Sequence, residues 1–153
     1  MSAQPTPRGR VLIVDDQPDI LEGMKLLLEM EGIDVITHGS IITLPFMIRE
    51  ANPDVILLDL SLPALSAPAL FRGGSQRVLR TDASVILFSG RSASELAVLA
   101  KELGAHGYVT KSEDSLAIVA RVKSWIQERR ALRALKENEG LHVAVRTASP
   151  ASH

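Results

Sequence analysis

Residues 54–59 read Asp-Val-Ile-Leu-Leu-Asp, four consecutive apolar side chains between two aspartates. The apolar run does not alternate with polar residues, which is typical of a central parallel strand that helices cover on both faces. Asn52-Pro53 precedes the run, and a loop rich in proline and serine follows it. We therefore predict a buried strand over Val55–Leu58 with the carboxylate of Asp59 at its carboxyl end.

Four more short apolar runs occur along the chain, and helical patterns separate them. The strands that these runs predict are Arg10–Val14, Ile33–Thr37, Val85–Phe88 and Gly107–Thr110. Strand and helix thus alternate five times. This alternation predicts an α/β fold in which a five-stranded parallel sheet carries helices on both faces, with right-handed crossovers.

Five helices are expected between and after the strands. Pro18 starts the first, because proline is pre-set for a first helical turn, and Gly32 stops it. Pro45 must bend or delay the second, and Gly73-Gly74 weakens the third by about 1 kcal/mol per glycine relative to alanine. The expected helices are Pro18–Glu31, Ser40–Glu50, Pro68–Arg80, Glu95–Leu103 and Leu116 to about Leu135.

Length and composition favour one small globular domain, and the lack of cysteine is compatible with a reducing compartment. The 153 residues contain no cysteine, carry a net charge of −1 and are 46% apolar, without a run of membrane-spanning length. These values exclude disulfides and thiolate metal sites, and they give no electrostatic reason to expect binding to nucleic acid or to a membrane. We expect a flexible leader over 1–9, the main domain over 10–128, and a helical extension with a flexible tail over 129–153.

Polar side chains follow four of the predicted strands at the point where each strand ends: Asp15 and Asp16, Asp59, Ser89, and Lys111. Each has an ordinary explanation by itself, as a helix cap, a turn residue or a solvated lysine. However, the carboxyl ends of parallel strands meet at one edge of the sheet, where ligands bind. Four unrelated roles at the same edge are less probable than one shared site, so we favour a shared site.

These residue types together suit phosphoryl transfer. Carboxylates in one pocket repel each other unless a cation is present, and Mg²⁺ binds carboxylate, water and phosphate oxygens. Lys111 offers a mobile positive charge for a phosphoryl group, and Ser89 offers a hydroxyl. Phosphoryl transfer needs mainly positioning and charge neutralisation, so Asp59 can act as an in-line nucleophile that forms an aspartyl phosphate.

The ordered set of motifs resembles the receiver domain of bacterial two-component response regulators, in particular the single-domain, chemotaxis-regulator-like type. The resemblance extends from Arg10 to about Glu128. It rests on four stretches: Val11-Leu-Ile-Val-Asp15-Asp16, Asp54-Val-Ile-Leu-Leu-Asp59 with Pro63 four residues on, Ile86-Leu-Phe-Ser89-Gly90, and Gly107-Tyr108-Val-Thr-Lys111. The family implies a flavodoxin-like sheet in the order 2-1-3-4-5 with five helices.

The resemblance also implies a role for each site residue. Asp59 is the phosphoacceptor, and Lys111 pairs with the phosphoryl group. Ser89 turns toward that group while Tyr108 changes its exposure, although Tyr108 also fits the plain role of a half-buried aromatic at a strand edge. Mg²⁺ is held by Asp15, Asp16 and Asp59 together with the backbone carbonyl of Ser61.

The chain departs from the family pattern at three places. Ser112 follows Lys111 where the family usually has proline, and Ala67 stands in the loop after Asp59 where glycine is usual. The Gly73-Gly74 pair is the third departure. All three leave the reacting groups in place, and they bear on switching and on partner geometry more than on phosphorylation.

The partners expected are a sensor histidine kinase or phosphotransfer protein and a downstream protein target. From Arg121 to Lys136 the last helix carries six basic side chains and one acidic one. This face is either solvated or a docking surface, with a homodimer through the last helices as one option. The chain is expected to be either a stand-alone regulator or a receiver from a longer protein, in a bacterial cytoplasm.

Two other functions fit parts of the pattern. A phosphohydrolase of the haloacid dehalogenase type also uses a strand-end aspartate with Mg²⁺, but that family has a second aspartate two residues after its nucleophile, and Gln17 stands two after Asp15. A binding module that signals without phosphorylation is the second alternative. A dinucleotide-binding domain fails, because no Gly-x-Gly-x-x-Gly follows the first strand.

Overall fold

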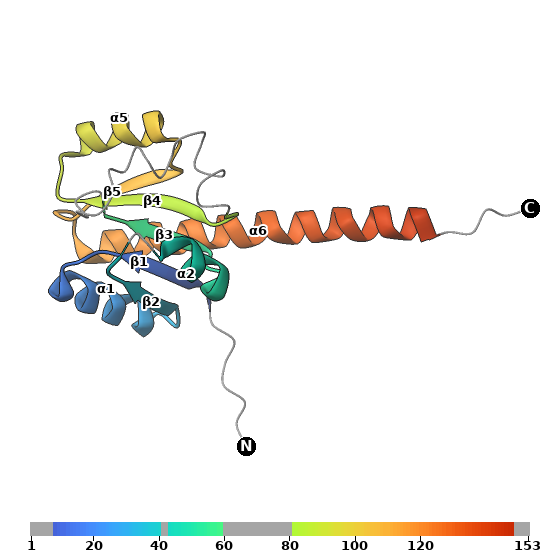
Figure 1. Ribbon diagram of the computed structural model, residues 1–153, viewed down its shortest axis with the longest axis horizontal. Coiled ribbons are helices and arrows are strands. Elements are labelled where there is room, and N and C mark those ends of the chain that lie inside the picture. Colours follow the sequence, from blue (N-terminus) through green and yellow to red (C-terminus); the bar gives the residue numbers. More distant parts are fainter. Residues whose placement is uncertain (1–7, 41–42, 60–80, 149–153) are drawn as a thin grey trace, which may run out of the picture.

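The computed structural model describes residues 8–40, 43–59 and 81–148, which form a five-stranded, wholly parallel sheet. The strands are β1 (Arg10–Val14), β2 (Asp34–His38), β3 (Val55–Leu58), β4 (Ser84–Ser89) and β5 (Gly107–Thr110). Their order in the sheet is β2-β1-β3-β4-β5 (Figure 1). The predicted strands and the doubly wound order implied by the resemblance are both confirmed.

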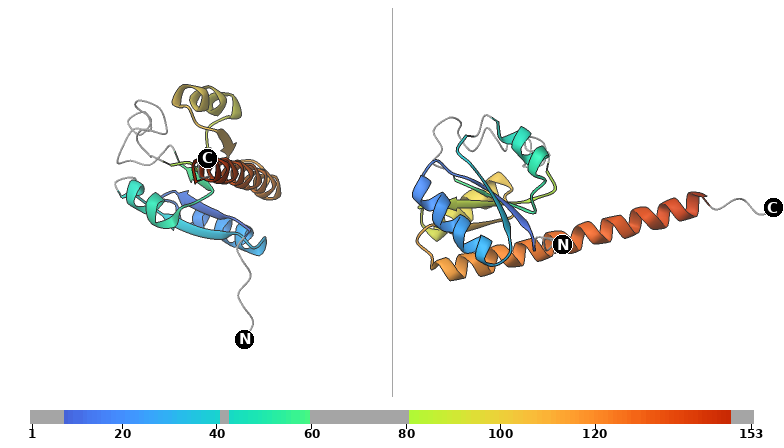
Figure 2. Two further views of the ribbon diagram at one scale, coloured as in Figure 1. Left: turned by 90° about the vertical axis from the view of Figure 1, so that its right-hand side faces the viewer. Right: turned by 90° about the horizontal axis from the view of Figure 1, so that it is seen from below.

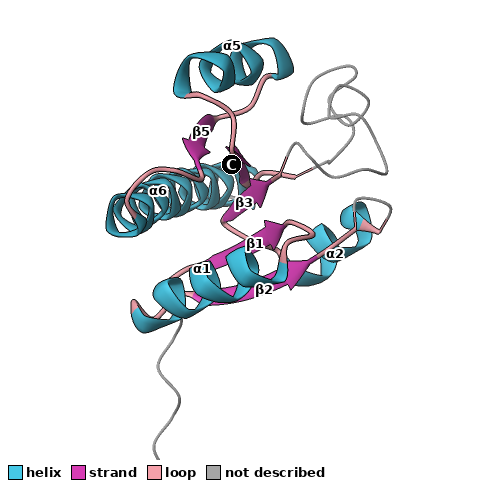
Figure 3. Cartoon of the chain, turned by 90° about the vertical axis from the view of Figure 1, so that its left-hand side faces the viewer, coloured by secondary structure: helices cyan, strands magenta, loops and turns pink. Residues whose placement is uncertain are grey.

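The described residues contain four helices: α1 (Pro18–Met30), α2 (Leu44–Ala51), α5 (Ala93–Leu103) and α6 (Ser115–Ala148). Helices α1 and α6 lie side by side on one face of the sheet (Figure 2, right). Figure 3 shows α2 on the opposite side of the strands from α6. The helix predicted over Pro68–Arg80, with Gly73-Gly74, lies outside the described residues.

Every residue of β3 is fully buried, as the uninterrupted apolar run predicted. Alternate strand residues point to opposite faces and build two separate apolar cores. Leu12, Ile56 and Leu87 pack with α2 and α5, whereas Ile13, Leu57 and Ile86 pack with α1 and α6. The sheet is therefore held from both sides, which fixes where each strand ends.

Two predicted helix limits are wrong. Helix α2 begins at Leu44 instead of Ser40, because Pro45 is tolerated only in the first helical turn and so sets the start. Helix α6 continues to Ala148 instead of ending near Leu135, so residues up to 148 that were expected in the flexible tail are helical. Gly140 weakens a helix by only about 1 kcal/mol relative to alanine and does not stop it.

Helix α6 is tied to the amino-terminal edge of the sheet by an arginine clamp, which we define as Arg130 and Arg133 with Asp54 and Asp82. Arg133 donates to Asp54 Oδ1 at 2.5 Å, to Asp82 Oδ1 at 2.7 Å and to the Pro53 carbonyl at 2.9 Å. Arg130 Nε lies 3.4 Å from Asp54 Oδ2. The clamp fixes the direction in which α6 leaves the sheet (Figure 1).

No helix among the described residues is both long enough and apolar enough to span a membrane.

Candidate functional site

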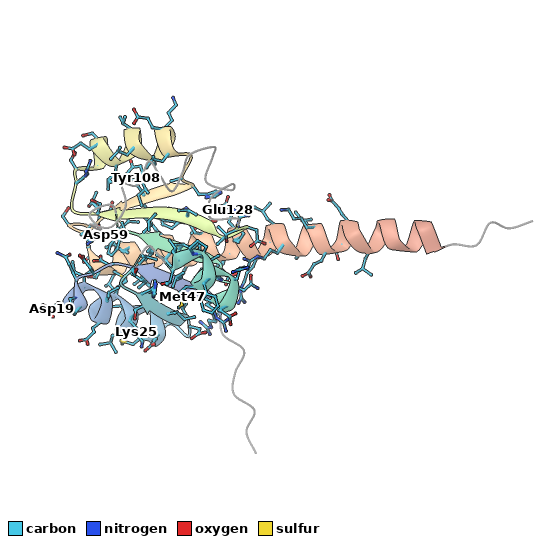
Figure 4. All side chains as sticks on the ribbon, viewed as in Figure 1. Asp19, Lys25, Met47, Asp59, Tyr108 and Glu128 are labelled. Atoms are coloured by element: carbon cyan, nitrogen blue, oxygen red, sulfur yellow. The ribbon has the colours of Figure 1, made fainter. Side chains whose placement is uncertain are left out.

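Three strand ends meet at the carboxyl edge of the sheet and carry the candidate site. Backbone hydrogen bonds extend the strand ladder past each end: Asp59 N–H donates to the Val14 carbonyl at 2.9 Å, and Lys111 N–H donates to the Ser89 carbonyl at 2.8 Å. Asp59 therefore sits beside the end of β1, where Asp15 and Asp16 follow Val14. Figure 4 shows Asp59 at the end of the domain opposite Glu128.

The three aspartates form one acidic cluster. Asp15, Asp16 and Asp59 each offer a carboxylate oxygen, and these oxygens all lie within 4.8 Å of one another. Asp15 and Asp59 are buried, with 0% and 1% of their surface exposed, whereas Asp16 is exposed. Like charges at this separation repel strongly where water is excluded, so the cluster is set up to receive a cation.

Lys111 supplies one positive charge to the cluster from the end of β5. Its Nζ lies 2.6 Å from Asp15 Oδ2 and 3.4 Å from Asp59 Oδ2, and its side chain is only 13% exposed. The ammonium also lies 5.4 Å from the centroid of the Phe88 ring, where a cation–π attraction helps to hold it. One lysine thus contacts both buried carboxylates.

Asp15 is the least satisfied of the buried acids. Burial raises the pKa of the Asp15 carboxyl, an effect that Lys111 and the backbone N–H of Gln17 oppose and that the charge of Asp59 reinforces. Gln17 N–H donates to Oδ1 at 3.0 Å. At Oδ2 the contact with Lys111 is an ion pair outside hydrogen-bond geometry, and no described group donates a hydrogen bond to that oxygen.

The donor set fits a hard divalent cation. All three ligands are carboxylate oxygens, Asp15 Oδ2 has a lone pair without a hydrogen bond, and Asp16 leaves one side open to water. A few carboxylates with an open, wet side suit Mg²⁺, which keeps several of its waters. The cluster can therefore hold a metal with the residues present.

Ser89 and Tyr108 are close to this edge but make other contacts. Ser89 is buried at the end of β4, and its Oγ accepts from the Arg91 N–H at 3.3 Å. Tyr108 is half-buried on β5, against the core on the α2 and α5 side (Figure 4). Ser61 and Ala67 lie outside the described residues. The structure thus joins Asp15, Asp16, Asp59 and Lys111 directly.

Gln17 is a site residue that sequence reasoning missed. Its side-chain Oε1 accepts from Lys111 Nζ at 3.1 Å, while its backbone N–H holds Asp15. Gln17 precedes Pro18 as the N-cap of α1 with an extended backbone, and this position turns it toward the acidic cluster. The signal was its place directly after two carboxylates at a strand end. In the sequence, Gln17 counted only as evidence against a phosphohydrolase.

Ser112, which stands where the family usually has proline, makes a hydrogen bond close to Lys111. Its hydroxyl lies 3.0 Å from the hydroxyl of Thr110, the last residue of β5. The hydroxyl pair spans Lys111, so it contributes to the turn that presents the lysine to the cluster.

Comparison with known proteins gives a family match over most of the chain. The family model of the response regulator receiver domain matches residues 11–123 of this chain. This range includes β2 to β5, all of β1 except Arg10, and every residue of the acidic cluster.

Curated relatives are about one third identical. The DNA-binding response regulator MtrA of Mycolicibacterium smegmatis is 35% identical over 121 residues, which cover 78% of this chain and 51% of the relative. The transcriptional regulatory protein KdpE of Mycobacterium tuberculosis is 34% identical over 127 residues, covering 83% and 55%. The chain therefore spans about half the length of the curated relatives it matches.

A solved structure of a response regulator receiver domain protein from Clostridium thermocellum has the same fold. It superposes with a TM-score of 0.67 at 27% identity, and the match covers 81% of this chain and 98% of that one. The match thus takes in almost the whole of the solved protein.

Proposed function

Because this chain belongs to the response regulator receiver domain family, we propose that it is a phosphorylation-dependent signalling switch whose acceptor is Asp59. The observation that carries the proposal is the buried acidic cluster with Lys111 in contact with two of its carboxylates. A receiver is a regulatory domain, so the family match also removes support for the phosphohydrolase alternative.

The phosphoryl group comes from a phosphohistidine of a sensor kinase or phosphotransfer protein. An oxygen of the Asp59 carboxylate attacks phosphorus in line, and the phosphorus–nitrogen bond breaks opposite to it. The imidazole nitrogen keeps the electron pair of that bond and takes up a proton. The product is an acyl phosphate on Asp59, which water later hydrolyses to restore the carboxylate.

The other residues neutralise and orient charge. Lys111 moves from Asp15 and Asp59 toward a phosphoryl oxygen, Ser89 turns its hydroxyl to another, and Tyr108 changes its exposure in step. Asp15, Asp16, Asp59 and the backbone carbonyl of Ser61 would hold Mg²⁺. The metal supplies a positive charge that offsets the negative charge developing on the phosphoryl oxygens.

The downstream partner is proposed to be another protein in a bacterial cytoplasm. MtrA is named a DNA-binding response regulator, but this chain has a net charge of −1 and the Arg133 guanidinium is occupied by the clamp. The acceptor unit is proposed to extend over 10–128, with 1–9 a leader and 129–153 an extension. Contact through the extension, including a homodimer, is the proposed route to the partner.

The acceptor assignment can be tested with Mg²⁺ and acetyl phosphate, followed by intact-mass measurement. The wild-type protein should gain one phosphoryl group, and Asp59→Asn should gain none. Asp82→Asn is the matched control, because Asp82 is an aspartate at the opposite edge of the sheet and should leave the adduct unchanged. An adduct that persists in Asp59→Asn would reject this acceptor. No adduct on the wild type would favour the phosphorylation-independent binding module.

A further inference from the structure

Outside the acidic cluster, one side chain of the edge strand β5 and two of helix α6 form a stack that includes the only tyrosine and the only tryptophan of the chain. We call Tyr108, Arg121 and Trp125 the edge stack. The Arg121 guanidinium carbon lies 5.8 Å from the Tyr108 ring centroid and 5.0 Å from the Trp125 ring centroid. One arginine thus reaches both aromatic rings at cation–π distance.

The edge stack joins the two cores around the free edge of the sheet. Tyr108 packs against the core on the α2 and α5 side, and Trp125 packs against the core on the α1 and α6 side. Among the strands that the structure describes, β5 is the last of the sheet, so no further described strand lies between these two side chains at that edge. Arg121, from α6, closes the gap between them.

Arg121 is also hydrogen bonded to β5 and to the turn that follows Lys111. Its Nη2 donates to the Tyr108 carbonyl at 2.7 Å, and its Nη1 donates to both carboxylate oxygens of Glu113 at 3.1 Å. Glu113 N–H in turn donates to the Thr110 carbonyl at 3.2 Å. Residues 108–113, with Lys111 in their middle, are therefore tied to α6 through one guanidinium group.

Trp125 fixes the other end of this connection. A methyl group built at Gly107 would lie 2.7 Å from Cζ2 of Trp125, so only glycine lets the indole sit directly on the start of β5. The ring is half-buried, and its surroundings therefore depend on how β5 and α6 sit against each other.

We propose that Arg121 is a positioning residue that couples Tyr108 and the Lys111 turn to helix α6, so that phosphorylation of Asp59 is reported at Trp125. The proposal rests on the function proposed above. When Lys111 leaves Asp15 for a phosphoryl oxygen, the turn over 110–113 shifts with it. Glu113 and the Tyr108 carbonyl then carry Arg121 along, and the indole environment changes.

The test uses the full chain, Mg²⁺ and acetyl phosphate, with two readouts on each sample. Intact mass reports the phosphoryl adduct, and Trp125 fluorescence, with acrylamide quenching, reports the edge stack. In the wild type the emission and the quenching constant should change as the adduct forms. In Arg121→Gln the adduct should form to the same yield while the fluorescence response is lost.

Two further variants keep the result decisive. Lys123→Gln is the matched control, since Lys123 is on the same helix but pairs with Glu31 at 3.0 Å on the side facing α1, and its response should equal that of the wild type. Arg121→Lys keeps the charge but cannot hydrogen bond to the Tyr108 carbonyl and the Glu113 carboxylate at the same time, so its fluorescence response should be reduced. This variant replaces Arg121→Gln if Arg121→Gln does not fold.

The outcomes separate the coupling from the phosphorylation itself. An adduct with an unchanged Trp125 signal in the wild type, or a full response in the Arg121 variants, overturns the coupling alone. A wild type that forms no adduct overturns the proposed function, and the coupling fails with it.

Discussion

Asp54 and Asp59 flank the same buried strand, β3, yet their surroundings are opposite. Asp54, at the amino-terminal edge, accepts from the backbone N–H of Arg10 at 2.8 Å and from the side chains of Arg130 and Arg133. Asp59, at the carboxyl edge, faces two further carboxylates and shares one lysine with Asp15. Both residues are almost completely buried.

The contrast indicates that Asp54 stabilises the fold, whereas Asp59 is the proposed reacting group. A buried carboxylate with several cationic donors is compensated for its loss of water. A carboxylate that shares one lysine with a second buried carboxylate is stabilised further when a cation binds beside it. Burial by itself does not distinguish the two aspartates, whereas the sign of their neighbours does.

The largest change in the free energy of unfolding should come from removing Asp54, the carboxylate with several cationic donors. Asp54→Ala leaves the Arg10 N–H and two guanidinium groups without their shared acceptor, so the free energy of unfolding should fall by about 3 kcal/mol in urea titrations. The control is Asp34→Ala, which removes a half-buried pair with Arg10 and should cost less than about 1 kcal/mol. Equal losses in the two variants would contradict the contrast.

Adding Mg²⁺ should raise the free energy of unfolding through the acidic cluster at the carboxyl edge of the sheet. At a Mg²⁺ concentration roughly ten times its Kd, the wild type should gain about 1.4 kcal/mol of unfolding free energy, because the metal binds the folded state alone. Arg133→Gln, which loosens the clamp, should keep this gain, while Asp15→Asn should lose most of it. Thermal melts with and without Mg²⁺ measure both. The same gain in Asp15→Asn would place the metal elsewhere.

Neutralising the crowded acid should have a smaller effect, of the opposite sign to Asp54→Ala. Without divalent cations, Asp59→Asn relieves repulsion from Asp15 and weakens the longer of the two Lys111 contacts, at 3.4 Å. We expect a gain of about 0.5 kcal/mol in unfolding free energy, together with loss of phosphorylation. A loss as large as that of Asp54→Ala would show that Asp59 is structural.

The smallest effect concerns the exposed end of the clamp. The hydrogen bond from Arg133 holds the pKa of the Asp82 carboxyl below its ordinary value of 3.8. Its contribution is therefore fully present above pH 3.8 and is lost as the pH falls through the lower, folded-state pKa. Asp82 is 48% exposed, so the contribution should be below about 0.5 kcal/mol. Comparing Asp82→Asn with the wild type in urea at pH 7 and at pH 3 measures it.

The sheet and most of the acidic cluster could be predicted because they follow from local patterns. The apolar run Val55–Leu58 specifies a two-sided strand, and the rule that parallel strands end at one edge brings Asp15, Asp59 and Lys111 together. The sequence does not predict hydrogen-bond distances, or how closely Lys111 approaches each of the two buried carboxylates, because both depend on side-chain geometry. Gln17 was missed for that reason, since its contact with Lys111 joins residues 94 positions apart.

The amino-terminal edge and helix α6 could not be predicted in the same way. The arginines of the last helix were expected to be solvated or to dock a partner, whereas Arg133 pairs with Asp54 across 79 positions. No periodicity specifies such a pair. The end of α6 was placed near Leu135 on the apolar stripe, but a helix continues beyond its stripe when no residue stops it.

The length of α6 beyond the clamp has a mechanical consequence. Residues 134–148 rise by about 1.5 Å each, so the helix reaches about 22 Å past Arg133. Its last described contacts with the sheet edge are those of the clamp, at Asp54 and Asp82. A tilt of about 10° at the clamp would sweep its far end through about 4 Å, comparable to most of one helical turn. An angular change too small to disturb the sheet would thus become a displacement that a bound protein can detect.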